Sequence, residues 1–118
     1  GSRGAAVAIA ELDPDAHRLR FVGIGNIAGT LVGAGERHGL VSMGGIVGYR
    51  EPAMRTFEHP LPADAVVILH SDGVSRRWNC HQVDQLLSGT PLVIAATLLR
   101  DAGIHHDDAC VLVGRANR

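Results

Sequence analysis

Two sets of carboxylates in the sequence could hold a divalent metal ion. Asp72 follows the continuously apolar residues 65–69, which are typical of a strand buried on both faces. Asp107 and Asp108 precede a second apolar segment, residues 109–114. If the two segments are neighbouring antiparallel strands, the end of one lies beside the start of the other, and the carboxylates converge. Mg²⁺ and Mn²⁺ bind to a few carboxylates and retain several waters, so such a pair would form part of a metal site.

Other interpretations of these and nearby residues stay open. Asp followed by Gly is a common turn sequence, so Asp72 could have a structural role alone. His105 and His106, with His70, suggest zinc or acid–base chemistry, but adjacent histidines point in different directions and no cysteine stands nearby. We therefore interpret these histidines as exposed loop residues without a metal-binding role. The consecutive residues His70, Ser71 and Asp72 cannot form a catalytic triad, because three neighbours cannot each face the next.

Two further motifs could bind a phosphate-bearing ligand. The pair Arg76–Arg77 lies beside Trp78, and a planar guanidinium suits phosphate, although a solvated loop is the simpler explanation. Residues 23–28 (GIGNIA) match the G-x-G-x-x-G/A fingerprint of nucleotide-binding oxidoreductases, which requires a following helix. Further glycines within residues 29–35 disfavour that helix. We interpret the motif as a tight strand crossing beside Asn26.

The composition indicates one globular domain. The chain has 118 residues, of which 46% are hydrophobic and 19% charged, with a formal net charge of −1. The hydrophobic content is too high for a disordered protein. The near-zero net charge gives no excess of basic residues for binding nucleic acid or an anionic membrane surface. No apolar run approaches the roughly 18 residues of a membrane span. Cys80 and Cys110 lack a zinc-site spacing and no signal sequence opens the chain, so we expect reduced thiols and a cytoplasmic protein.

The elements that must position these residues change in character along the chain. The first half predicts a meander of short strands, at residues 5–12, 18–24, 27–33, 38–43 and 54–59. Their short connections leave no room for crossover helices. After the buried strand 65–69, Thr90 and Pro91 begin a helix that ends at Gly103; it is apolar on nearly every side, which predicts a core helix. The order predicts an α+β fold, a layered β-sandwich flanked by helices.

Several short motifs occur in a characteristic order. They are Arg3-Gly4-Ala5-Ala6, Gly25-Asn26, Gly44-Gly45-Ile46-Val47-Gly48, Ser71-Asp72-Gly73-Val74 and Asp107-Asp108-Ala109-Cys110-Val111. In this order they resemble the C-terminal part of the SpoIIE/RsbX-like phosphatases, which are metal-dependent serine/threonine protein phosphatases of the PPM (2C) class. The resemblance covers residues 3–115. Residues 1–2 are typical of a cloning remnant, and residues 116–118 form a short tail.

The resemblance implies a dinuclear Mn²⁺ or Mg²⁺ site at one edge of the sandwich. Asp72 matches the metal-binding aspartate of the family's T/S-D-G motif, and Asp107 matches the aspartate of its D-D/D-N motif. Asp108 would then not bind the metal directly, but would support the metal ligands or have a structural role. The family's N-terminal D-G-x-G-H-G motif has no match in this chain. The resemblance therefore implies an N-terminally truncated domain with a partial metal site, weakly active or inactive alone.

The implied reaction is hydrolysis of a phosphoserine or phosphothreonine by a metal-activated water. Relatives act in bacterial signal transduction and stress response, on a phosphorylated anti-sigma-factor antagonist in a partner switch. The alternative is a non-catalytic regulatory binding module with the same fold. We expect no nucleic-acid or membrane partner, and a homodimer through the apolar surface that a truncated sandwich would expose.

Overall fold

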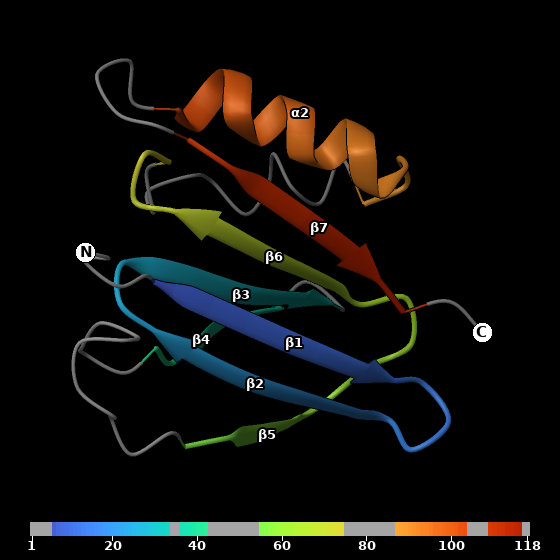
Figure 1. Cartoon of the computed structure of the whole chain (residues 1–118). Coiled ribbons are helices and arrows are strands. Elements are labelled where there is room, and N and C mark those ends of the chain that lie inside the picture. Colours follow the sequence, from blue (N-terminus) through green and yellow to red (C-terminus); the bar gives the residue numbers. More distant parts are fainter. Residues whose placement is uncertain (1–5, 34–35, 43–54, 75–86, 104–108, 117–118) are drawn as a thin grey trace.

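The computed structural model describes residues 6–33, 36–42, 55–74, 87–103 and 109–116. In chain order the strands and the helix are β1 (Val7–Asp13), β2 (Arg18–Ile24), β3 (Ile27–Gly33), β4 (Glu36–Leu40), β5 (Phe57–Pro60), β6 (Val66–Ser71), α2 (Pro91–Ala102) and β7 (Val111–Arg115). The strands form two stacked sheets, and α2 covers the outer face of one of them (Figure 1). This arrangement confirms the predicted layered α+β sandwich.

The two sheets enclose the main hydrophobic core. One sheet has the order β1-β2-β5 and the other β4-β3-β6-β7, and all pairs of neighbouring strands are antiparallel. Leu19 and Phe21 of β2 are fully buried against Leu31, Val67 and Leu69 of the facing sheet. The period-two alternation that predicted a half-buried strand over residues 18–24 is therefore confirmed, because every second residue of β2 enters the core.

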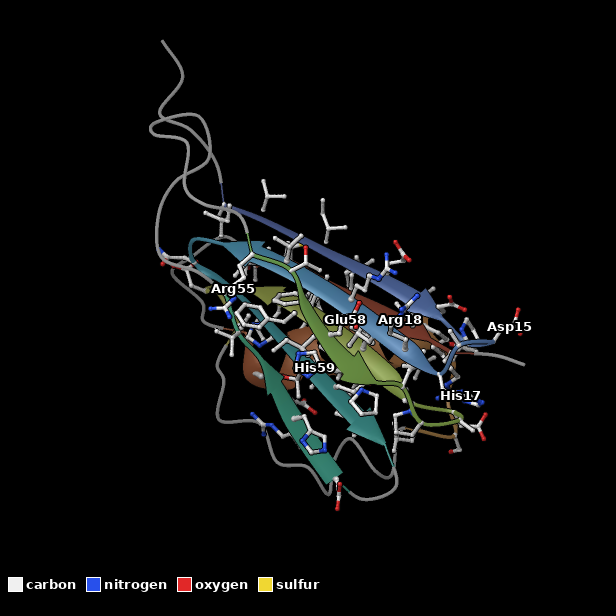
Figure 2. All side chains as sticks on the ribbon, turned by 90° about the horizontal axis from the view of Figure 1, so that it is seen from below. Asp15, His17, Arg18, Arg55, Glu58 and His59 are labelled. Carbon is white, nitrogen blue, oxygen red and sulfur yellow. The ribbon has the colours of Figure 1, made fainter. Side chains whose placement is uncertain are left out.

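The outer face of the three-stranded sheet carries a ladder of ion pairs. Arg18 lies 3.9 Å from Asp13 and 3.8 Å from Glu58, and Arg20 lies 3.4 Å from Glu58 and 3.8 Å from Glu11. Arg18 and Glu58 can be seen on the neighbouring strands β2 and β5 (Figure 2). The two arginines thus pair with three carboxylates, and exposed pairs contribute little stability each. The ladder therefore explains the polar positions of β1, β2 and β5 without any ligand.

Strand β6 is buried on both faces, as predicted from its continuous apolar run. Val67 and Leu69 face the core between the sheets, whereas Val66 and Ile68 pack beneath α2. The strand lies between β3 and β7 in the centre of its sheet. A central strand that is covered on both faces moves little, so the residues at its end occupy fixed positions.

Helix α2 begins and ends where the sequence predicted, but its environment differs. The backbone N–H of Val93 donates to Thr90 Oγ1 at 3.3 Å, and Gly103 caps the C-terminus. The prediction of a core helix is wrong, because in the described part of the chain only one face of α2 is covered. Ile94 and Leu98 are buried against the sheet, while Leu92 is 79% exposed. No helix of the described residues is both long and apolar enough to cross a bilayer.

The connection between β2 and β3 corrects the predicted meander. These two strands lie in different sheets, and the chain crosses from one to the other within two residues. Gly25 has a φ of 91°, in the region that favours glycine, and the N–H of Ile27 donates to its carbonyl oxygen at 2.9 Å. A strand and not a helix follows, so the nucleotide-binding interpretation of residues 23–28 is wrong. The tight strand crossing beside Asn26 is confirmed.

Candidate functional site

The end of β6 and the start of β7 lie side by side at one edge of the four-stranded sheet. The strands are antiparallel neighbours, and His70 is registered opposite Val111. Beyond that pair, the N–H of Ser71 donates to the carbonyl oxygen of Cys110 at 3.1 Å, and the N–H of Cys110 donates to Ser71 Oγ at 3.0 Å. The strand arrangement on which the convergence of carboxylates depended is therefore confirmed.

Asp72 stands on this edge, exposed to solvent, in a turn that is anchored on several sides. The N–H of Val74 donates to the carbonyl oxygen of Ser71 at 3.2 Å, which closes the turn around Asp72. Val74 is buried and forms an isolated antiparallel bridge with Gly103, at the end of α2. The exposed carboxylate of Asp72 thus projects from a turn that is fixed by β6, β7 and α2, which suits a metal ligand.

The donor chemistry fits a hard divalent cation only in part. A carboxylate oxygen is the ligand type that Mg²⁺ and Mn²⁺ prefer. However, the described residues hold no group of three or more His, Cys, Asp or Glu side chains that could bind a metal ion. Asp72 is the one residue of the predicted metal pair that the structure describes. Several predicted site residues lie outside the described ranges, so their roles stay predictions: Asp107, Asp108, His105, His106, Arg76, Arg77 and Trp78.

His70 is not the exposed loop histidine that the sequence predicted, because it lies within β6 with its side chain in the interior. Its side chain is 3% exposed, and Nδ1 lies 2.9 Å from the carbonyl oxygen of Ser71. A carbonyl oxygen only accepts, so Nδ1 carries the proton and donates. Ser71 Oγ accepts from the backbone of Cys110. Both side chains bond to backbone groups, which agrees with the exclusion of a triad over residues 70–72.

An apolar groove opens between β1 and the strands β6 and β7. It has a volume of about 340 Å³, and its lining residues are Ala8, Ile9, Ala10, Leu12, Val67, Leu69, Leu112, Val113 and Gly114. Ile9 is 57% exposed and Leu112 is 63% exposed. Sequence reasoning could not locate this groove, because its lining comes from β1, β6 and β7, which are distant from one another in the sequence. The apolar sequence at residues 111–113 was the available signal.

The chain is similar to proteins of known structure. The family model of stage II sporulation protein E matches residues 1–117. No curated protein matches the sequence. A structure of the bacterial stressosome, a modular system that has been adapted to control secondary messenger signalling, has 22% identity and a TM-score of 0.83, over 96% of this chain and 59% of that chain.

Two phosphatase structures are also similar. RsbX in complex with magnesium has 19% identity and a TM-score of 0.75. The phosphatase domain of SpoIIE, the cell fate determinant of Bacillus subtilis, has 17% identity and a TM-score of 0.68. Each match covers 96% of this chain and 56% of the other chain, so the chain spans less than two thirds of these structures. At such low identity the similarity establishes the fold.

Proposed function

The chain belongs to the family of stage II sporulation protein E, and from this premise we propose that its full-length protein is a metal-dependent phosphoprotein phosphatase. Its fold is that of PP2C (PPM) phosphatase domains. The observation that carries the proposal is the position of Asp72. An exposed carboxylate stands in a fixed turn after a doubly buried strand, at the point where β7 begins. This geometry suits a residue that holds a cation at the edge of the sheet.

The residues of this edge have different roles in the proposed reaction. Asp72 would hold Mn²⁺ or Mg²⁺, and we propose Asp107, which precedes β7 in the sequence, as the second carboxylate. When bound, such an ion lowers the pKa of a coordinated water and makes it a nucleophile near neutral pH. The two hydrogen bonds between Ser71 and Cys110 keep the strand ends together. Of the similar structures, SpoIIE was presoaked with Mn and RsbX contains magnesium.

For the substrate we propose a phosphoserine or phosphothreonine on an anti-sigma-factor antagonist, in a bacterial cytoplasmic stress response. The support is the similarity to RsbX, to SpoIIE and to a stressosome structure. The second candidate is a non-catalytic regulatory binding module with the same fold. It is supported by the similarity to a structure of the stressosome, a modular system adapted to control secondary messenger signalling. The two candidates differ in whether metal-dependent phosphate release occurs.

We expect the 118-residue chain alone to release phosphate slowly or not at all. Its sequence offers Asp72 and Asp107 but no D-G-x-G-H-G motif, and an ion with few anchoring carboxylates binds weakly. The measurement is phosphate release from a phosphoserine peptide in a Mn²⁺ series, with the full-length protein as the matched comparison. Clear Mn²⁺-dependent release by the chain alone would contradict the partial site. An inactive full-length protein that still binds its partner would favour the binding module.

We also propose that a second copy of the chain covers the groove between β1 and β7. In the described part of the chain both strands lie at sheet edges, and unpaired edges beside exposed Ile9 and Leu112 favour association. Sedimentation velocity is expected to show a dimer that Leu112→Ser dissociates. Leu92→Ser is the control, because Leu92 is an exposed leucine on α2, remote from the groove lining. A monomer at every concentration would contradict this proposal.

A further inference from the structure

The crossing between β2 and β3 brings Asn26 to the same edge of the sheet as Asp72. Strands β3 and β6 are antiparallel, and the pair at this end of their ladder is Ile27 opposite Ser71. Asn26 and Asp72 each directly adjoin a residue of this last pair, so both stand in the turns at the same edge of the sheet. Asn26, Asp72 and the start of β7 thus occupy three adjacent strand ends.

The backbone around Asn26 is held in place by short contacts. The N–H of Ile27 donates to the carbonyl oxygen of Gly25 at 2.9 Å, and Ser42 Oγ donates to the carbonyl oxygen of Ile27 at 2.7 Å. At Gly23, a Cβ atom would lie 2.6 Å from Ser42 Oγ, so the chain on the other side of the turn is also tightly packed. Asn26 itself is exposed. Its side chain is therefore not required to fill the core, although its backbone position is fixed.

We propose that the side-chain amide of Asn26 binds the phosphoryl group of the substrate at this edge. The inference rests on the proposed phosphatase function and adds a substrate-binding residue to that site. The amide N–H would donate to a phosphoryl oxygen, and hydrogen bonds to charged groups are the stronger ones. A neutral donor suits the edge that carries Asp72, because a cationic side chain there would pair with the carboxylate and compete with the metal ion.

The test is Asn26→Ala in the full-length protein. Asn26 is not among the described residues with a positive φ, so alanine fits the backbone. The KM for a phosphoserine peptide is expected to rise about ten- to a hundred-fold, and the affinity for inorganic phosphate in the presence of Mn²⁺ to fall by a similar factor, for the loss of one hydrogen bond to a charged group. The dissociation constant of Mn²⁺ and the Tm are expected to stay at their wild-type values.

The control is Asp15→Ala, an exposed residue in the turn at the opposite end of β2. It is expected to leave KM, phosphate affinity and Mn²⁺ affinity unchanged. If the wild-type full-length protein shows no metal-dependent activity, the proposed function fails. If it is active and Asn26→Ala changes neither KM nor phosphate affinity, this inference alone is overturned. A parallel loss of Mn²⁺ affinity or of Tm would also overturn it, because Asn26 would then serve the metal site or the fold.

Discussion

Replacement of Asp72 by asparagine in the full-length protein is expected to abolish metal-dependent phosphate release, lowering kcat/KM at least about a hundred-fold. Loss of an outer partner of a metal ligand already costs ten- to a hundred-fold in affinity or activity, and loss of a direct ligand should cost more. Asparagine keeps the size of the side chain but removes its charge. Because Asp72 is exposed, the Tm is expected to stay unchanged. Phosphate release from a phosphoserine peptide and a Mn²⁺ binding titration, made on the same samples, measure both effects.

The matched control is Asp64→Asn. Asp64 is also exposed and lies in the turn before β6, at the end of the strand opposite to Asp72. Its φ of 60° falls in the left-handed region, which asparagine tolerates as well as aspartate does. This variant should retain full activity and full Mn²⁺ affinity. Unchanged turnover in Asp72→Asn, or an equal loss in both variants, would contradict the assignment of Asp72 as a metal ligand.

The parts of the candidate site that the sequence predicted depend on short-range patterns. An unbroken apolar run at residues 65–69 can only be a strand covered on both faces or part of a buried helix, and the flanking Pro62 and Gly73 favour the short strand. The position of Asp72 at the end of this strand follows directly. The Thr90 cap and Gly103 likewise mark the ends of α2, because capping involves only the first and last turns of a helix.

The parts that the sequence could not predict depend on pairing between distant segments. Strands β2 and β3 are adjacent in sequence and carry similar residues, yet they belong to different sheets. The position of Asn26 at the same sheet edge as Asp72 follows from the register of β3 on β6, and register is set by side chains far apart in the chain. The exposure of Leu92 could not be predicted for the same reason. The sequence pattern shows which residues share a face of a helix, but not which face packs against the sheet.

The core between the two sheets is expected to dominate stability, and a pair of leucines tests this. Leu19 of β2 is fully buried between the sheets, whereas Leu112 of β7 is 63% exposed beside the groove. Leu19→Ala is expected to lower the free energy of unfolding by about 2–5 kcal/mol, because it leaves a cavity as well as losing apolar burial. Leu112→Ala should cost less than about 1 kcal/mol, because most of its side chain already contacts water.

Urea unfolding at protein concentrations below those at which a dimer forms measures both values. The m-value should stay constant, so that the difference in midpoint reports stability alone. Equal losses at low concentration would contradict the layered core, because one of the two leucines has little burial to lose. A loss for Leu112→Ala that grows with protein concentration has a different meaning. It would show that the groove is covered by a second copy, since mass action adds the free energy of association to that of folding.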